Sequence, residues 1–226
     1  MAKSIGIVSQ RPNTGNTTVA LNLGLALHTL GQRVIVLDAD LSKSNILEHL
    51  YMRDLPIDLN TVLNNDAHIY DSIFTHKSGL RLISSASANS LMSEKTDSEK
   101  IGLHLDDLSP NNDFIIIDMP KNMTIMDELL KYSDAALIVH SPEYSSKSVL
   151  DMQKLLSKNK VDNLGVILNR SPDTSVNSIF KTPVISKIPR HRHILKSFEM
   201  KHPMLYIYPN STISKRFFSI AERLIQ

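Results

Sequence analysis

Short, continuously apolar segments alternate with helix-like segments along the whole chain, and this alternation constrains the fold more than any other feature. The apolar segments expected to be β-strands are residues 4–9, 33–37, 80–84, 114–117, 135–140, 164–168 and 184–188. Continuous apolar character is typical of strands covered on both faces, and strands separated by helices pair in parallel. The sequence therefore predicts an α/β fold with a mainly parallel β-sheet flanked by helices on both faces.

Helices are expected where the apolar pattern changes its period. Residues 17–30 are apolar along most of their length and stop at a glycine, which often follows the end of a helix. Residues 145–157 and 211–224 are amphipathic. The last of these segments has the pattern of either a core helix or a membrane-surface helix, and we expect core packing. We also expect residues 84–100 to be a loop that runs into a helix, and residues 205–208 to be extended.

The overall composition limits the class of protein. A chain of 226 residues with 42% hydrophobic and 21% charged residues is expected to form one globular domain, residues 1–226. It contains no cysteine, which excludes disulfides, thiolate metal sites and iron–sulfur clusters and fits a reducing compartment. Its N-terminal apolar segment is too short for a signal peptide, and no run approaches the length of a membrane span. A cytoplasmic protein is therefore expected.

Charge is distributed unevenly along the chain. Residues 170–226 hold ten of the 25 Lys/Arg residues but three of the 23 Asp/Glu residues. Such an asymmetry fits either a solvated basic surface or a site for an anionic partner. The basic residues between 187 and 201 could bind DNA nonspecifically, but no recognition-helix motif supports sequence-specific binding. His191 and His193 lack carboxylate neighbours in sequence, so we do not interpret them as a metal site.

The turn after the first expected strand has features of a phosphate site. It reads Gln10-Arg11-Pro12-Asn13-Thr14-Gly15-Asn16-Thr17-Thr18 and leads at once into a helix. Backbone N–H groups and the helix dipole make such a turn favourable for an anion. The P-loop motif G-x-x-x-x-G-K-[ST] adds a lysine for the phosphates and a hydroxyl for magnesium. Gly15 and Thr17 match this motif, whereas Asn16 stands at the lysine position. By itself, the segment also fits an ordinary strand–turn–helix connection capped by Thr17.

Carboxylates at two later strand ends favour the phosphate interpretation. Asp38 and Asp40 follow the second expected strand, and Asp118 follows the strand at 114–117. The carboxyl ends of parallel strands form the edge at which ligands bind in α/β proteins. A lone Asp in such a place is more often a helix cap, but a magnesium–phosphate site requires carboxylates aimed at one crevice. The three together predict a nucleotide site.

These segments resemble the MinD/ParA family of deviant Walker A P-loop ATPases, whose loop reads K-G-G-x-G-K-[ST]-T. Over residues 11–18 the chain has Arg for the signature lysine, Pro-Asn for the two glycines and Asn for the second lysine. The stretches ALNLGLALHTLGQRVIVLDADL and DFIIIDMP are similar to the family's first helix, second strand and Walker B strand. SDAALIVHSPEYSSKSVLDM, VILNRSP and KIPRHRHILKS are similar to its later strand ends. The resemblance extends from about residue 4 to about residue 224.

The resemblance implies a role for each matching residue. The phosphates of ATP would be surrounded by Asn13, Thr14, Gly15, Asn16, Thr17 and Thr18. The ligands of Mg²⁺ would be Thr17, Asp38 and Asp118. Asp40 would orient the attacking water, and Arg11 would reach the partner's nucleotide across a homodimer. The adenine would lie beside Asn169 and Pro189, although Asn169 also fits the closing of a strand end.

Departures from the family loop predict weaker chemistry. Pro12 supplies no N–H, and Asn13 enters the left-handed region less freely than glycine. Asn16 is short and neutral, so the γ-phosphate would lose its main cationic partner, an effect of about 3–4 kcal/mol. Arg11 could compensate in part through its planar guanidinium. We therefore expect ATP binding with weak or absent hydrolysis.

Members of this family place cellular structures, and their ATP-bound dimers bind a surface and a partner. The resemblance implies a protein that helps to position a pilus, flagellum, division site or DNA, acts with a protein partner and is recruited to a membrane or cell pole. The loop is most similar to degenerate-loop members such as the TadZ/CpaE group of pilus-positioning proteins. The alternative is a nucleotide-free interaction scaffold that has kept only the fold. Two other classes are disfavoured, because ATP-dependent ligases need the loop lysine and nitrogenase-reductase-like carriers need cysteine.

Overall fold

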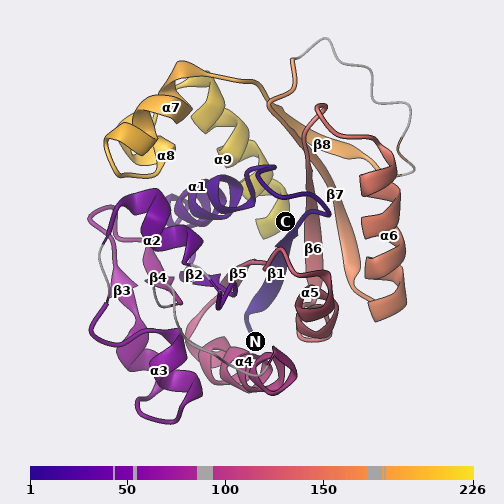
Figure 1. Ribbon diagram of the computed structural model, residues 1–226. Helices are drawn as coiled ribbons and strands as arrows, with labels where there is room; N and C mark the ends of the chain where they lie inside the picture. Colours follow the sequence, from indigo (N-terminus) through magenta and orange to yellow (C-terminus); the bar gives the residue numbers. More distant parts are fainter. Residues whose placement is uncertain (43, 53–54, 86–93, 173–179, 181) are drawn as a thin grey trace.

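An eight-stranded sheet forms the centre of the molecule, with the strand order β3-β4-β2-β5-β1-β6-β7-β8 (Figure 1). The computed structural model describes the chain except residues 43, 53–54, 86–93, 173–179 and 181. The strands are β1 (Lys3–Val8), β2 (Val34–Asp38), β3 (Phe74–Thr75), β4 (Arg81–Ile83), β5 (Phe114–Asp118), β6 (Ala135–His140), β7 (Asp162–Asn169) and β8 (Val184–Ile188). Neighbouring strands are parallel except for β3 and β4. The sheet is therefore mainly parallel, as predicted.

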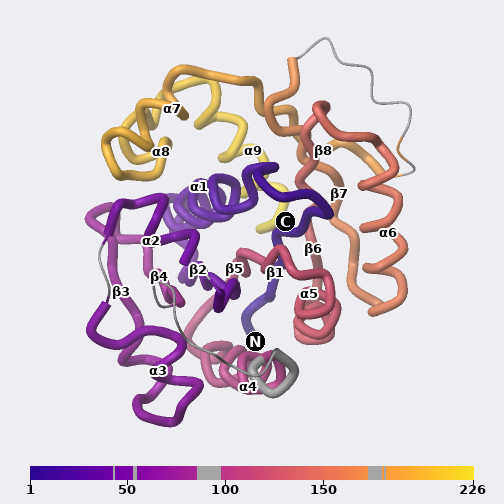
Figure 2. The backbone as a smooth tube through the Cα atoms, viewed as in Figure 1, coloured from indigo at the N-terminus to yellow at the C-terminus, as the bar shows by residue number. Residues whose placement is uncertain are grey.

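Helices connect the strands and cover the sheet on both sides. They are α1 (Asn16–Thr29), α2 (Asn45–Leu50), α3 (Leu59–Leu63), α4 (Glu94–Leu108), α5 (Met123–Leu130), α6 (Lys147–Asn159), α7 (Arg192–Glu199), α8 (Met204–Ile207) and α9 (Thr212–Ile225). Short 3₁₀ turns add residues Ile69–Ser72 and Ser109–Asn111. Figure 2 traces the chain through the connections between the strands. Because the strands other than β3 are parallel, their carboxyl ends lie at one edge of the sheet.

Side chains of the central strands alternate between two separate cores. In β2, Val34 and Val36 join the core beneath α1, α2, α8 and α9, whereas Ile35 and Leu37 join the core beneath α3 to α6. Successive residues of a strand point to opposite faces, and both faces of β2 are apolar. The continuous apolar runs in the sequence thus reflect burial on both sides, which confirms the predicted α/β architecture.

Helix α1 is buried along most of its length, from Thr18 to Leu27, because it lies between the sheet and α9. Its end is confirmed at Gly31, which has a φ of 86°. Helix α9 buries Phe217 completely and packs on α1. The expectation of core packing for the last amphipathic segment is therefore confirmed. In the ranges that the structure describes, no helix is both long and apolar enough to cross a membrane.

One expectation about the connections needs correction. Residues 205–208 were expected to be extended, but Met204–Ile207 form α8, so that prediction is wrong. Asn22 of α1 accepts a hydrogen bond from the Leu205 N–H at 2.8 Å, and this one-turn helix buries Met204 and Leu205 together against α1. Of the expected loop at 84–100, residues 86–93 lie outside the described residues, and α4 begins at Glu94.

Candidate functional site

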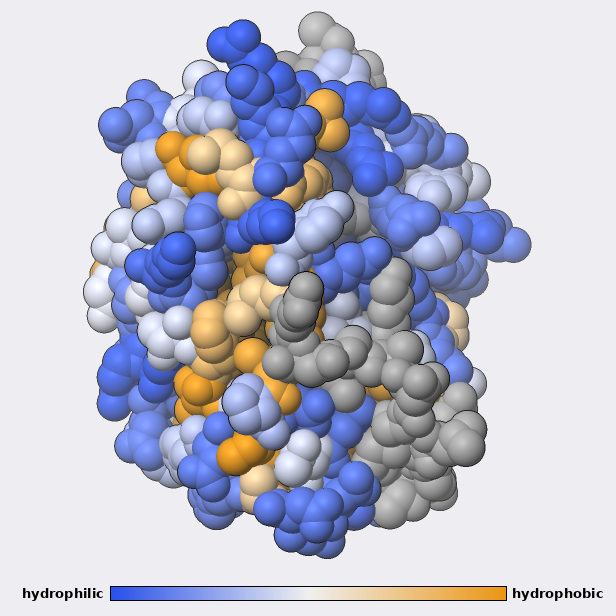
Figure 3. Space-filling model, turned by 60° about the vertical axis from the view of Figure 1, so that its left-hand side comes forward, coloured by the Kyte–Doolittle hydropathy of each residue, from blue (hydrophilic) through white to orange (hydrophobic). Residues whose placement is uncertain are grey.

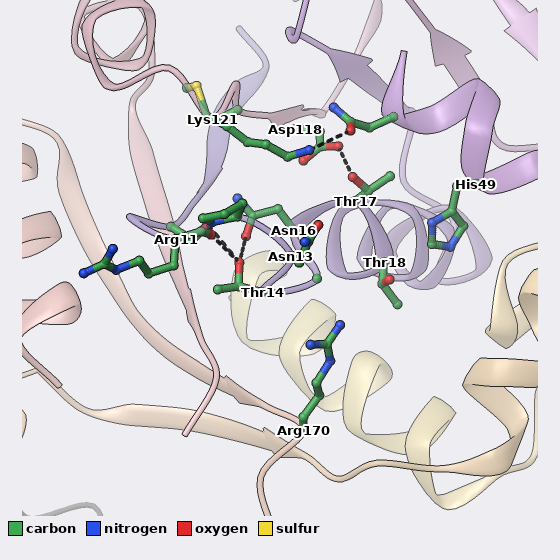
Figure 4. Close-up of a pocket in the computed structure, with 15 residues that line it drawn as sticks. Arg11, Asn13, Thr14, Asn16, Thr17, Thr18, His49, Asp118, Lys121 and Arg170 are labelled. Atoms are coloured by element: carbon green, nitrogen blue, oxygen red, sulfur yellow. Dashed lines mark hydrogen bonds between the residues drawn. The ribbon is translucent and has the colours of Figure 1, made fainter. Parts of the chain in front are cut away.

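The loop that joins β1 to α1 lines a hollow of about 240 Å³ at the carboxyl edge of the sheet (Figure 4). All of the predicted phosphate-binding residues from Asn13 to Thr18 line this hollow, which we call the loop hollow. Asp118, at the end of the neighbouring strand β5, lines it as well. The structure thus brings residues 13–18 and Asp118 together at one hollow.

Hydrogen bonds among its own side chains hold the loop in shape. Asn13 adopts the left-handed conformation, with a φ of 59°. The Thr14 hydroxyl lies 2.8 Å from Ser9 Oγ and 3.1 Å from Asn16 Oδ1, and it can donate to either. The amide of Asn16 in turn donates to the carbonyl oxygen of Ile7 at 3.3 Å. Asn16 thus folds back against β1 and contributes to the loop's own structure.

Gly15 and Asn169 fix the end of the loop. Gly15 has a φ of 99°, a conformation that side chains rarely permit. The Asn169 amide at the end of β7 donates a 2.6 Å hydrogen bond to the carbonyl oxygen of Thr14. A Cβ atom on Gly15 would lie 2.2 Å from that amide nitrogen. Glycine is therefore required both for the backbone conformation and for the close approach of Asn169.

Thr17 and Asp118 form the polar centre of the loop hollow. The Thr17 hydroxyl donates to Asp118 Oδ2 at 2.6 Å, across the gap between α1 and β5 (Figure 4). Asp118 is 2% exposed, and its burial, with the nearby carboxylate of Asp38, raises its pKa well above the ordinary value. The Thr17 bond and the charge of Lys121 oppose that rise in pKa. The site thus carries a carboxylate that a cation would stabilise.

Asp38 lies beside Asp118 but behind the wall of the loop hollow. The two aspartates are register partners on β2 and β5. Oδ1 of Asp38 accepts from the N–H of Asp40 at 3.2 Å, and Oδ2 accepts from the N–H of Ile46 at 3.0 Å. Burial raises the pKa of Asp38 despite these bonds. Asp38 is fully buried and does not line the hollow.

Asp40 is also held by its own segment. Its carboxylate accepts from the hydroxyl of Ser42 at 2.6 Å and from the amide of Asn45 at 3.2 Å, and Asp40 is 6% exposed. It does not line the loop hollow. The structure therefore places Asp40 close to the site through Asn45, which does line the hollow.

A second hollow, of about 290 Å³, continues from the first and shares Gly15, Thr18 and Arg170 with it. Asn169 and Pro189, the two residues predicted to border an adenine, both line it. Arg190 and His191 also line it, and α7 adds the apolar side chains of Ile194, Leu195 and Phe198. A polar hollow joined to a more apolar one has the form needed for a phosphate chain attached to a flat, apolar ring.

Three side chains with a full positive charge line the loop hollow among the residues described: Arg11, Lys121 and Arg170. Arg11 points away from Thr17 and Asp118, whereas Lys121 extends toward them (Figure 4). Lys121 was missed by the sequence reasoning, and the available signal was its place three residues after Asp118. Arg170 lies 3.5 Å from Glu143, which also pairs with Arg190.

A third, more open hollow lies between α2 and α7. It is lined by apolar and aromatic side chains of Leu47, Tyr51, Met52 and Phe198, and by the cation of Lys201 over the Tyr51 ring. Figure 3, which views the molecule from the side of α2, shows apolar side chains gathered amid polar ones on that face. Among the basic residues between 187 and 201 that the sequence suggested for DNA binding, Arg190 forms an ion pair with Glu143.

The donor set around Asp118 fits a magnesium ion carried by phosphates. Mg²⁺ binds through one or two carboxylates and keeps several waters or phosphate oxygens as its other ligands. Within the described part of the chain, no group of three or more His, Cys, Asp or Glu side chains could hold a metal unaided. The hydroxyl of Thr17 and the carboxylate of Asp118 are oxygen donors at one point of the wall.

A loop between the first strand and helix, facing an aspartate at the end of the adjacent strand, defines the class of P-loop nucleotide-binding proteins. The AAA domain family model matches residues 2–166. An uncharacterized ATP-binding protein of Methanocaldococcus jannaschii is 31% identical over 237 residues, covering 100% of this chain and 88% of the relative. The septum site-determining protein MinD of Helicobacter pylori is 24% identical, covering 91% and 84%.

A solved structure shows the same fold. The septum site-determining protein MinD of Pyrococcus horikoshii, complexed with Mg-ADP, superposes with a TM-score of 0.85 at 25% identity, covering 99% of this chain and 96% of that one. The chain therefore belongs to the AAA domain family, and within it to the MinD/ParA-like P-loop ATPases.

Proposed function

We propose that this protein binds Mg-ATP in the loop hollow and works as a positioning protein of the MinD/ParA type, with slow or absent hydrolysis. The observation that carries the proposal is the Thr17–Asp118 hydrogen bond in a hollow lined by residues 13–18. It joins a hydroxyl and a carboxylate at the N-terminus of a buried helix, where an anion is favoured. A relative named as an ATP-binding protein and a neighbour solved with Mg-ADP support this choice of ligand.

The ligand would extend across the two joined hollows. Backbone N–H groups of residues 13–18 would hold the phosphates, and Asn169 and Pro189 would border the adenine. Thr17 and Asp118 would hold Mg²⁺, with Asp38 as a further ligand. Bound magnesium neutralises phosphate charge. Asp40 would orient a water for attack.

Slow hydrolysis is proposed because the lysine position of the loop carries no charge. Asn16 uses its amide to bind Thr14 and Ile7, so it does not extend toward a γ-phosphate. Arg11 points away from the polar centre of its own hollow (Figure 4). This direction supports a role for Arg11 across the face of a homodimer, at the partner subunit's nucleotide, as the family resemblance implies.

The cellular role is proposed from the relatives. The Helicobacter pylori relative is named for determining the septum site. We propose that this chain likewise acts as a homodimer with a protein partner at a membrane, cell pole or nucleoid surface, placing a division site, pilus, flagellum or DNA. The degenerate loop supports the TadZ/CpaE-like pilus group among these choices.

Calorimetric titration with Mg-ATP and Mg-ADP tests the site, and a phosphate-release assay with the same protein tests turnover. We expect micromolar binding, turnover far slower than in relatives with the loop lysine, and a larger solution mass with Mg-ATP. Thr17→Val should weaken binding, because the valine removes the hydroxyl but keeps the shape. Brisk turnover would contradict the proposed role of Asn16.

The alternative is an interaction scaffold that binds no nucleotide. It predicts no thermal shift with ATP, ADP or their magnesium complexes, whereas binding predicts stabilisation that grows with ligand concentration. The folded-back Asn16 is the observation that favours the scaffold, because it leaves the loop without its usual cation.

A further inference from the structure

A nucleotide in the loop hollow would need a positively charged partner that the loop itself does not supply. A triphosphate that bound there would bring several negative charges next to the buried carboxylate of Asp118, and Asn16 offers no compensating charge. A site of this kind needs a positive group whose side chain reaches the same point. The three cationic side chains that line the hollow differ in the direction in which they point and in their partners.

Two of the three are less favourably placed. Arg11 is exposed, and its side chain points out of the hollow, away from Thr17 (Figure 4). Arg170 enters from the β7 side and lies at the junction of the two hollows. Its guanidinium is 3.5 Å from Glu143, which reduces the charge that it presents to a ligand.

Lys121 is placed differently, because its backbone is fixed on both sides. It lies between Asp118 at the end of β5 and Asn122, whose side chain caps α5 by accepting from the N–H groups of Thr124 and Ile125. From this anchored position its side chain extends over the loop toward Asp118 and Thr17 (Figure 4).

The ammonium group of Lys121 is held only weakly. It donates to the neutral amide oxygen of Asn45 at 3.4 Å, beyond the usual range for a strong hydrogen bond. A lysine on a flexible stem, with a long bond to a neutral partner, can exchange that partner for a phosphate oxygen.

We propose that Lys121 supplies, from the β5–α5 connection, the positive charge that the loop lacks at Asn16, and that its ammonium group binds the phosphate oxygens of the nucleotide. This inference rests on the proposed nucleotide site. It assigns the charge to a residue outside the loop, so that the loop supplies shape and backbone N–H groups while a separate segment supplies the cation.

The test is calorimetric titration of the full chain with Mg-ATP, Mg-ADP and AMP. Lys121→Ala should weaken Mg-ATP binding about tenfold or more, as expected for loss of a charged hydrogen bond, and should leave AMP binding nearly unchanged. Lys121→Arg should retain most of the Mg-ATP affinity. Lys154→Ala is the matched control, because Lys154 is exposed on α6 and lines neither hollow.

A double variant tests whether a cation in the loop can replace the cation at residue 121. Asn16→Lys in the Lys121→Ala background should recover part of the lost Mg-ATP affinity, because it returns a cation to the loop. If Lys121→Ala binds Mg-ATP as tightly as the wild type, this inference is overturned and the proposed function is not. Failure of the wild type to bind any of the three nucleotides overturns the proposed function and this inference with it. Equal losses for Mg-ATP and AMP also overturn it, since they indicate a general disturbance of the hollow.

Discussion

Asp118 is a residue whose burial lowers the stability of the fold. Its carboxylate is buried next to that of Asp38, and both carboxyls have raised pKa values because burial disfavours their charged forms. The hydroxyl of Thr17 is the hydrogen-bond partner that the structure gives to Asp118 Oδ2. Without a cation, this arrangement destabilises the folded chain.

Replacement of that carboxylate should separate stability from binding. We expect Asp118→Asn to raise the Tm of the ligand-free protein at pH 8 by a few degrees, about 1 kcal/mol, because the charge is removed while the Thr17 bond can be kept. The same variant should weaken Mg-ATP binding. Differential scanning calorimetry and titration check the two effects, and a lower Tm without ligand would contradict the assigned strain.

For single residues, the sequence predicted which side chains lie close together better than it predicted where those side chains point. It placed Thr17 and Asp118 at one site, and the structure shows a 2.6 Å contact between them. It described Asn13 only as able to enter the left-handed region, which the residue does adopt, with a φ of 59°. It could not show that Asn16 folds back onto Ile7, since that bond depends on the depth of the loop against β1. Lys121 was missed because the direction of a lysine side chain leaves no periodic signal.

The loop between β1 and α1 is the element whose shape depends most on one glycine. Gly15→Ala should cost about 1–3 kcal/mol in the free energy of unfolding and reduce nucleotide binding, because it combines a φ of 99° with a 2.2 Å approach to Asn169. Gly31→Ala is the control: its φ is 86°, but no atom lies within 4 Å of the added Cβ. Chemical denaturation of both variants measures the difference, and equal costs would show that the Asn169 contact does not matter.

Helix α9 is the element that the sequence predicted to pack in the core rather than on a membrane surface. Phe217→Ala should lower the free energy of unfolding by about 3–5 kcal/mol, because the ring is fully buried beside α1. Ile225→Ala, at a position 41% exposed near the end of the same helix, should change it by less than about 1 kcal/mol. Urea denaturation provides the comparison. A small effect of Phe217→Ala would indicate that α9 does not need its core contacts.

Elements were predictable where the pattern was long. The parallel strands gave clear apolar runs, and α1 and α9 gave clear helical spacing. Strand β3 has only two residues, and α8 has one turn, so neither is long enough to show a period. For α8 the outcome depended on the Leu205 bond to Asn22, a partner 183 residues away in the chain.

Across the whole molecule, a histidine cluster joins the β3 edge of the sheet to the segment around α8. His76 Nε2 lies 2.9 Å from His202 Nδ1, and both rings contact Tyr206. Burial, followed by the charges of His202 and Lys77, lowers the pKa of His76 to about 4. The folded state thus binds fewer protons than the unfolded state between pH 6.5 and 4.

Acid should therefore weaken the fold through this cluster. As the pH falls from 6.5 to 4, His76 should reduce the free energy of unfolding by about 1–2 kcal/mol, because only the unfolded state takes up its proton freely. The buried carboxyls of Asp38 and Asp118 act in the opposite direction, so the test is a difference. His76→Gln should lose less stability than the wild type as the pH falls across this range, as measured by denaturation curves. Parallel curves would exclude a contribution from His76.

The bond from Asn169 to Thr14 has a consequence for signalling through the molecule. It connects the turn that would grip a phosphate chain to the last residue of β7, which pairs directly with β8 at the rim of the sheet. Any rearrangement of the turn must either carry this rim along or break the amide contact. A shift of the turn that keeps the contact would therefore move the end of β7 and, through β8, the start of α7.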